Sequence, residues 1–254
     1  MLPEEQELIK KLSIADLERA QAYAKDLGHG LQILRTFPQG VTIFGSARLP
    51  QEDKYCQKAA ELGAELAKNG HTVVTGGGPG IMEAASRGAY EYGGRTIGLN
   101  ITLKHEQFPN PYLTDCLTFE YFFARKVMLA MASKVFVVFP GGLGSLDELS
   151  EVIELIKEDK MPKMPVFLFG KSFWKPLDKM FQKMVKMGLA DQKDFHLCQV
   201  TDDIFDIVKA ANKIGHPKIS DNYYDGFHEA AKIAAKNRHN DSEPAVKTRK
   251  SSQQ

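Results

Sequence analysis

Two glycine-rich segments of the sequence could hold a phosphate group with their backbone amides. Residues 76–80 contain four glycines, and residues 140–145 read Pro-Gly-Gly-Leu-Gly-Ser before an amphipathic helical pattern. Glycines leave backbone N–H groups uncovered, and the first turn of a helix adds unpaired N–H groups and a favourable dipole. A tight turn alone is the alternative, but it needs fewer than four glycines, so we favour a ligand site at residues 76–80.

A carboxylate and a pair of cations accompany the second segment. Glu148 lies three residues after Ser145, the spacing of a capping box in which both side chains only satisfy amides at the helix end. Read alone, Glu148 fits that structural role. The adjacent Asp147 makes the helix start more acidic than a cap requires, and an acid beside an anion site needs a balancing cation. Arg125 and Lys126 are the candidate cations, although a solvated helix face is the commoner role of such a pair.

Two further segments could border the same site. Residues 44–48 include Gly45 and Ser46, small residues that let a ligand or backbone approach closely. Arg48 could reach an anion or simply point to solvent, and on its own we favour solvent. Residues 100–112 form a long polar stretch with two prolines. Long loops in compact domains are often functional, so we expect this loop beside the site with most of its residues on the surface.

Alternating strands and helices must position these segments. Short, nearly all-apolar runs predict parallel strands buried on both faces at 41–44, 72–75, 96–99, 135–139 and 166–169, with a weaker strand at 196–200. Helical patterns occupy 53–69, 80–92, 120–132, 145–157 and 202–213. The alternation predicts an α/β fold: a doubly wound, Rossmann-like parallel sheet flanked by helices in a single domain. In such sheets ligands bind at the carboxyl ends of the strands, which the glycine segments follow.

The remaining segments divide the chain into four regions. We predict an N-terminal helical arm over 1–35, ended by Gly28 and Gly30, and a Rossmann-like nucleotide-binding domain over 36–213. A C-terminal helix within 214–237 and a disordered tail over 238–254 follow. Met180, Met184 and Met187 recur at helical spacing, and we interpret them as a stripe in the core.

Composition and charge exclude several classes of protein. The formal net charge is +1, from 33 Lys and Arg against 32 Asp and Glu, so we expect no nucleic-acid partner. The three cysteines lack the C-x-x-C spacing of a zinc or redox site, and no ligand cluster predicts a metal. No apolar run reaches the length of a membrane span, and the N-terminus has no signal-peptide core. We therefore expect a cytoplasmic protein that binds no membrane and needs no metal or cofactor.

The glycine segments differ from the common nucleotide-binding motifs. The chain has no G-x-x-x-x-G-K-[ST] P-loop and no strict G-x-G-x-x-G, and Asn100 stands about where a dinucleotide site would place an acid. The H-E-x-x-H and G-x-S-x-G motifs are also absent. Two glycine cradles on neighbouring strands therefore favour a mononucleotide over a dinucleotide.

Three segments together resemble the LOG (Lonely Guy) family of cytokinin-activating nucleoside 5′-monophosphate phosphoribohydrolases. They are residues 76–83 (Gly-Gly-Gly-Pro-Gly-Ile-Met-Glu), 122–126 (Phe-Phe-Ala-Arg-Lys) and 140–148, within a resemblance that spans about residues 40–210. The combination of Arg-Lys with P-G-G-x-G-[TS]-x-x-E is specific, whereas each part alone is weak. Ser145 stands where the family usually has threonine and keeps the hydroxyl, and residues 1–35 and 215–254 lie outside the pattern.

The resemblance implies roles for individual residues. Arg125 and Glu148 would be the catalytic pair, and the glycine segments would hold the phosphate and the ribose. The residues implied in binding the substrate or its phosphate are Gly45, Ser46, Gly77, Gly78, Gly80, Met82, Glu83, Lys126, Pro140, Gly141, Gly142, Gly144 and Ser145. Because the family's site lies near a dimer interface, a homodimer or a higher homo-oligomer is also implied.

The implied reaction is hydrolysis of the N-glycosidic bond of AMP or a cytokinin riboside monophosphate, giving free base and ribose 5-phosphate. A carboxylate can stabilise the oxocarbenium-like sugar and activate water while an arginine holds the phosphate, so neither a metal nor a redox cofactor is required. Many bacterial members of the family carry the older label "lysine decarboxylase-like", but no lysine stands out as a pyridoxal-phosphate site. The alternative function is non-catalytic binding of a nucleotide or a molybdenum cofactor on the same fold, and a scaffold role comes third.

Overall fold

The structure is a computed structural model that describes residues 13–103 and 108–215. One compact unit begins at Glu18 and contains the whole sheet. The helix predicted within 214–237 and the tail predicted over 238–254 lie outside the described residues, apart from residues 214 and 215. The four-part division of the chain remains a prediction.

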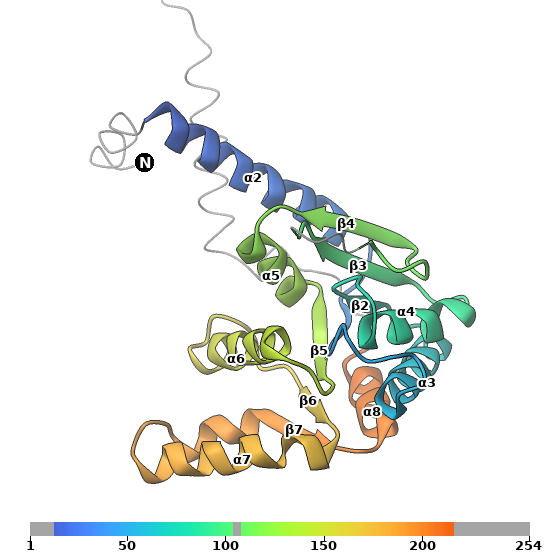
Figure 1. The fold of residues 1–254 in the computed structure, drawn as a ribbon, viewed down its shortest axis with the longest axis vertical. Helices are drawn as coiled ribbons and strands as arrows, with labels where there is room; N and C mark the ends of the chain where they lie inside the picture. The colour runs from blue at the N-terminus through green and yellow to red at the C-terminus, as the bar shows by residue number, and fades with distance from the viewer. Residues whose placement is uncertain (1–12, 104–107, 216–254) are drawn as a thin grey trace, which may run out of the picture. The chain divides into compact units, whose positions relative to one another are not determined.

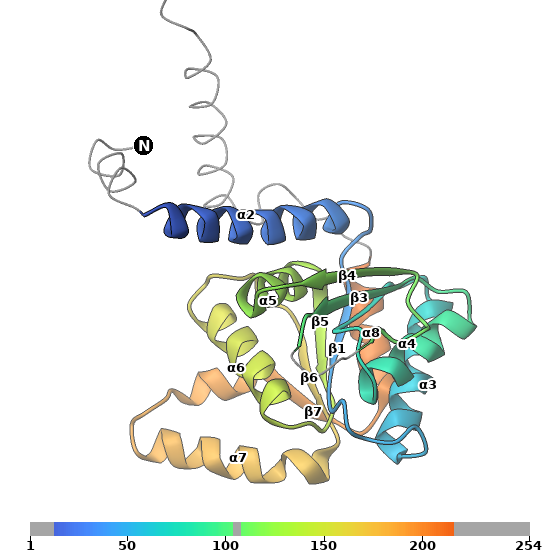
Figure 2. The same cartoon turned by 45° about the horizontal axis from the view of Figure 1, so that its top comes forward.

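Seven parallel strands form one sheet in the order β4-β3-β2-β1-β5-β6-β7. Figure 1 labels most of these strands, and Figure 2 labels β1. The strands are β1 (Gly40–Phe44), β2 (Val73–Thr75), β3 (Thr96–Ile101), β4 (Asp115–Phe119), β5 (Ser133–Val138), β6 (Val166–Phe169) and β7 (Cys198–Thr201). Every residue of β1, β2, β3, β5 and β6 is buried, as the nearly all-apolar runs predict. The predicted α/β fold class is confirmed.

Helices cover both faces of the sheet (Figure 2). They are α2 (Ile14–Leu34), α3 (Lys54–Lys68), α4 (Ile81–Glu91), α5 (Phe122–Met131), α6 (Leu143–Lys157), α7 (Lys171–Lys186) and α8 (Ile204–Ile214), and the 3₁₀ helix η1 (Gln192–Leu197) precedes β7. The main core lies where α3, α4 and α8 pack on one face of β1, β2, β5 and β6. On the opposite face lie α5 and α6, the two helices that carry the predicted Arg125 and Glu148.

The point where the sheet reverses its winding lies between β1 and β5. These strands are neighbours in register, with Phe44 opposite Val138, while the chain continues from β1 to one side and from β5 to the other. Their carboxyl ends leave an opening between diverging loops, which is where open α/β sheets bind ligands. The glycine segment at residues 140–145 follows β5 directly.

Sequence reasoning missed β4. Its burial alternates, with Cys116 and Thr118 exposed and only Phe119 fully buried, because it is the edge strand of the sheet. The search for all-apolar runs could not detect a strand of this kind. The segment 100–112 therefore connects two adjacent strands, β3 and β4, at the edge of the sheet.

The predicted end of the N-terminal helix at Gly28 and Gly30 is wrong. Helix α2 continues through both glycines to Leu34. Gly30 is buried, and a Cβ there would lie 2.4 Å from Cγ of Met128 on α5. Tertiary packing therefore uses this glycine for close contact between two helices instead of a helix stop.

The predicted core stripe of methionines is also wrong. Met180 is 48% exposed and Met187 is 61% exposed, and Trp174 is the only fully buried residue of α7. The helical period was read correctly, but periodicity alone does not say whether another element covers the apolar face.

We expect this difference in burial to govern stability. Trp174→Ala should lower the free energy of unfolding by about 3–5 kcal/mol, because it empties a buried site and removes the bond from Nε1 to the Phe169 carbonyl. Met180→Gln should change it by no more than about 0.5 kcal/mol. Urea unfolding of the two variants measures both effects. A large loss in Met180→Gln would instead indicate that another surface covers α7.

Candidate functional site

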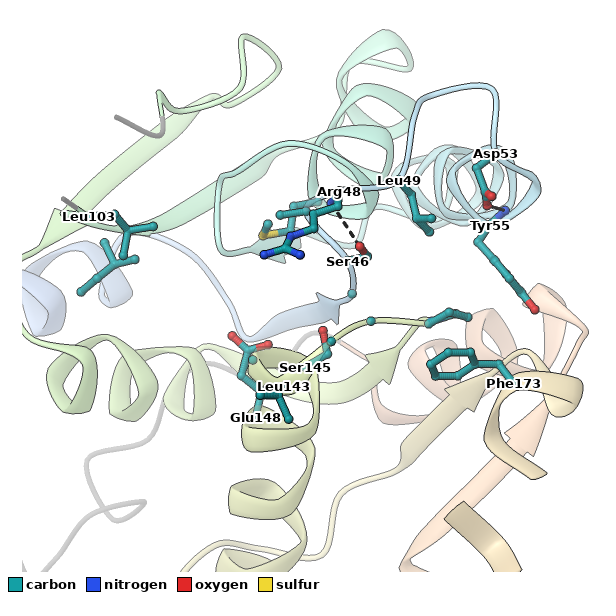
Figure 3. Close-up of a pocket in the computed structure, with 18 of the residues that line it drawn as sticks. Ser46, Arg48, Leu49, Asp53, Tyr55, Leu103, Leu143, Ser145, Glu148 and Phe173 are labelled. Atoms are coloured by element: carbon teal, nitrogen blue, oxygen red, sulfur yellow. Dashed lines mark hydrogen bonds between the residues drawn. The ribbon is translucent and has the colours of Figure 1, made fainter. Parts of the chain in front are cut away.

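A cavity of about 860 Å³ opens at the carboxyl ends of β1 and β5. The predicted residues that line it are Gly45, Ser46, Met82, Arg125, Pro140, Gly141, Gly142, Gly144, Ser145 and Glu148. The other predicted residues, Gly77, Gly78, Gly80, Glu83 and Lys126, are not among its lining residues. In Figure 3, Leu103 lies at one end of the cavity, Tyr55 and Phe173 lie at the other, and Ser145 and Glu148 lie between them.

The backbone of Ser46 joins the three loops that surround the cavity. Its N–H donates to the carbonyl of Pro140 at 3.0 Å, and its carbonyl accepts the N–H of Ile81, the first residue of α4, at 3.0 Å. The loops after β1, β2 and β5 are therefore connected by main-chain hydrogen bonds. Ser46 itself needs no particular side chain for this, so its hydroxyl stays available to the cavity and to the N–H of Arg48, which it accepts at 3.1 Å.

The glycine segment at residues 76–80 shapes the cavity more than it lines it. A Cβ on Gly76 would lie 2.2 Å from Nη2 of Arg125, so only glycine lets the guanidinium take its place. Asn110 binds the segment from the other side, donating its N–H to Gly77 O at 2.8 Å and its amide to Gly78 O at 3.1 Å. The long loop before β4 thus supports this segment, as expected of a loop beside the site. Direct contact between a phosphate and Gly77, Gly78 or Gly80 remains a prediction.

The second glycine segment forms the start of α6, and here the predicted capping box is wrong. The N-cap is Gly142 and carries no side-chain cap, so Ser145 and Glu148 lie inside the helix instead of at N-cap and N3. Ser145 is buried against Gly141. The helix begins earlier because the glycines themselves form its first turn. Its terminal amides therefore have no side-chain cap, and the residues of this helix start line the cavity, an arrangement that suits an anion.

Arg125 and Glu148 meet at the wall of the cavity. Nη2 of Arg125 lies 3.5 Å from Oε1 of Glu148, and their side chains are 11% and 15% exposed. Arg125 is held from behind, where its Nε donates to the carbonyl of Leu99 in β3 at 2.8 Å. Three elements of the sheet and its helices therefore fix this pair.

The surroundings disfavour charge on both members of the pair. Burial raises the pKa of Glu148 to about 7, against the opposing effect of Arg125. Burial likewise lowers the pKa of Arg125, and Glu148 opposes that change. Desolvation is the larger cause in each case, so the two charges only partly compensate each other. A carboxyl group that titrates near neutral pH within a cavity is typical of a functional site.

Lys126 binds acidic residues instead of facing the cavity. Its Nζ lies 3.2 Å from a carboxylate oxygen of Asp147 and 3.2 Å from one of Glu151, both on α6. This cluster joins α5 to α6 beside the Arg125–Glu148 pair. The negative charges of Asp147 and Glu151 raise the pKa of Glu148, and the positive charge of Lys126 opposes that effect.

Several residues of the cavity carried no signal in the sequence. Arg48 is exposed, as the solvent reading predicts, and it also lines the cavity. Tyr55 from α3 and Phe173 from α7 belong to no motif. Phe122 lines the cavity as well, one turn before Lys126 on α5. Arg48 had a cue, since it lies in the small-residue loop after β1, and Phe122 belongs to the segment 122–126 that carries the family resemblance. Tyr55 and Phe173 are brought to the cavity by α3 and α7, which pack near the carboxyl end of the sheet.

Two searches of the described ranges had negative outcomes. Within residues 13–103 and 108–215, no three His, Cys, Asp or Glu side chains lie together in a way that could hold a metal ion. Among the helices of that same part of the chain, none has both the length and the apolar character to cross a membrane.

Comparison with known proteins connects this site to a family. The chain is 32% identical over 100 residues to a cytokinin riboside 5′-monophosphate phosphoribohydrolase of Mycobacterium marinum and 33% identical over 100 residues to that of Mycobacterium tuberculosis. Each match covers 39% of this chain and 54% of the relative, so the chain spans about half the length of the curated relatives it matches.

A solved structure shows the same fold. The molybdenum cofactor carrier protein of Chlamydomonas reinhardtii superposes with a TM-score of 0.53 at 24% identity, covering 69% of this chain and 97% of the carrier. A family profile described as "Possible lysine decarboxylase" matches residues 82–211, from the start of α4 to α8, and includes Arg125 and Glu148. Because this match covers about half of the chain, the protein belongs to that family, the one that contains the LOG proteins.

Proposed function

We propose that the protein hydrolyses the N-glycosidic bond of nucleoside 5′-monophosphates, releasing the free base and ribose 5-phosphate. The observation that carries the proposal is the Arg125–Glu148 pair, which lies in a cavity beside the uncapped start of α6. The names of the two mycobacterial relatives support the same reaction, with a cytokinin riboside 5′-monophosphate as substrate. AMP is the simplest substrate of this class.

The start of α6 is the proposed site for the 5′-phosphate. Gly141, Gly142 and Gly144 line the cavity at the helix end, where unpaired N–H groups and the helix dipole favour an anion. Arg48 and the hydroxyl of Ser46 face the same cavity and can supply further donors. The guanidinium of Arg48 and the backbone amides at the start of α6 would together offset the negative charge that a phosphate brings close to Glu148.

Glu148 is the proposed catalytic carboxylate. When the C1′–N bond breaks, its electron pair leaves with the base, which takes up a proton from solvent, and C1′ becomes an oxocarbenium-like cation. Water then forms the new C1′–O bond and loses a proton. An ionised Glu148 stabilises the cation and accepts that proton, while Arg125 holds Glu148 and the substrate in place.

We also propose a homodimer working in the cytoplasm. Four large apolar side chains at the starts of α5 and α6 are exposed: Phe122, Phe123, Leu143 and Leu146. We propose that these side chains form one contact surface, because an exposed apolar patch is typical of a surface that meets another protein. The reducing cytoplasm fits three cysteines that show no motif for pairing.

Substitution of Glu148 tests the proposed reaction. Glu148→Gln should lower kcat for AMP hydrolysis by about 10²- to 10⁴-fold, because the amide can neither accept the proton nor stabilise the cation. Glu154→Gln is the matched control: it lies on the same helix, is 61% exposed and pairs with Lys157, so activity should persist. Release of free base from a panel of monophosphates is the measurement. An inactive wild-type protein that retains an unchanged ligand would indicate a binding protein instead.

The pH dependence of the reaction should follow Glu148. Its pKa of about 7 in the free protein means that the required carboxylate form is lost as the pH falls through 7. The value of kcat/KM should therefore drop tenfold per pH unit on the acidic side, and Glu154→Gln should keep this limb. Carbon-13 NMR titration, with Glu148 assigned from the Glu148→Gln spectrum, gives the same midpoint independently. A carboxyl midpoint near 4.5 would contradict the prediction.

Self-association can be measured directly. Light scattering should give about twice the 28.3 kDa mass of one chain, and Leu146→Glu should shift the protein toward that single-chain mass. Leu189→Glu changes a side chain that is 69% exposed and is not one of the four at the starts of α5 and α6, and it should leave the mass unchanged. A wild-type protein that stays monomeric at high concentration refutes this part of the proposal.

A further inference from the structure

Helix α2 precedes the family match and contributes no residue to the cavity, yet it holds the start of α5. Asp26 on α2 is 9% exposed. Its Oδ2 accepts the N–H of Glu120 at 2.9 Å and the N–H of Tyr121 at 3.0 Å, the two residues that lead into α5. The N-cap residue of α5 is Tyr121, which provides no side-chain cap of its own. Asp26 therefore fixes, from another helix, the backbone of the two residues that lead into α5.

Two further contacts extend this connection along α5. The ring of Tyr23 packs edge to face on Tyr121 and Phe123, with ring centres 4.5 and 5.0 Å apart. One turn after Asp26, Gly30 gives Met128 room to approach the α2 backbone. α2 thus contacts α5 before its first turn, in its first turn and near its end. Such contacts fix both the position and the rotation of a helix.

The rotation of α5 determines where Arg125 lies. Arg125 is one turn after Tyr121, and its own backbone N–H donates to the Tyr121 carbonyl at 3.2 Å. Its guanidinium reaches both the Leu99 carbonyl and Glu148, and the 3.5 Å separation from Glu148 leaves little tolerance. A displacement of about 1 Å at a catalytic group can cost about 100-fold in rate.

We propose that Asp26 is a positioning residue for Arg125, so that α2 belongs to the working unit of the site. The inference rests on the proposed function for its kinetic readout. It assigns a role to a helix that lies outside the region matched by the family profile. Asp26 acts through the α5 backbone and touches neither Arg125 nor the cavity.

The experiment compares three variants. Asp26→Ala removes the acceptor of the Glu120 and Tyr121 N–H groups, and Asp26→Asn keeps its shape with a neutral, weaker acceptor. Asp203→Ala is the matched control, because Asp203 caps α8 by accepting the Phe205 N–H at 2.9 Å, away from α5 and the cavity. For each folded variant, Tm, kcat, KM for AMP and the acidic limb of kcat/KM are measured.

We expect Asp26→Ala to lower kcat about 10- to 100-fold and to move the acidic limb to higher pH. The limb moves because a displaced Arg125 no longer opposes the raised pKa of Glu148. Asp26→Asn should recover much of kcat, and Asp203→Ala should lose Tm while keeping kcat and the limb. If Asp26→Ala loses Tm but keeps wild-type kcat and the limb, Asp26 is merely structural and the inference is overturned.

A second readout separates this inference from the proposed function. If the wild-type protein cleaves no monophosphate, the proposed function fails, but the NMR titration of Glu148 still reports on Arg125. A higher Glu148 midpoint in Asp26→Ala than in wild type supports the positioning role, and an unchanged midpoint overturns it. Should Asp26→Ala fail to fold, the same comparison is made with Asp26→Asn, for which we expect a smaller shift in the same direction.

Discussion

Arg125 and Glu148 are ionisable groups of opposite charge in a place largely closed to water, and the surrounding elements hold these two side chains together. Burying an ion pair seldom stabilises a fold, because desolvation offsets the attraction between the charges. Here burial is the main cause of the shifted pKa of both partners, and in each case it disfavours the charged form. The pair therefore destabilises the folded protein. The Leu99 carbonyl holds the guanidinium and Gly76 makes room for it. The Lys126 cluster ties α5 to α6, so that the two charges stay together.

The parts of the fold that could be predicted are those whose local pattern and final environment agree. Strands such as β1 and β5 read as apolar runs because helices cover both of their faces. β4 escaped detection because it lies at an edge of the sheet, where two of its five residues are exposed to solvent. Gly30 and Met180 misled for a shared reason. Whether a glycine ends a helix, and whether an apolar stripe on a helix is buried, depends on which element packs against that helix. The local sequence does not identify that element.

The residues of the site divide in the same way, into those that the local pattern places and those that only tertiary packing brings in. The segment at residues 140–148 carries its own helix start, so its place at the end of β5 follows from local pattern, and Glu148 comes with it. The capping box was the natural reading of Ser145 and Glu148, yet the glycines before them begin the helix sooner. Tyr55 and Phe173 are separated from that segment along the chain. They come together only because α3 and α7 pack near the carboxyl end of the sheet. No spacing rule could have found them.

The raised pKa of Glu148 gains a meaning if the proposed reaction is correct. In the free protein the ionised carboxylate is held at a disadvantage, because burial removes more stabilisation than Arg125 returns. A phosphate bound at the start of α6 adds negative charge and deepens that disadvantage. The positive charge that develops on the sugar in the transition state relieves it. An interaction that is poor in the ground state and favourable in the transition state is what lowers a barrier, whereas equally good binding of both states would not. The burial that makes the pair costly to fold is therefore the same property that would make it useful for catalysis.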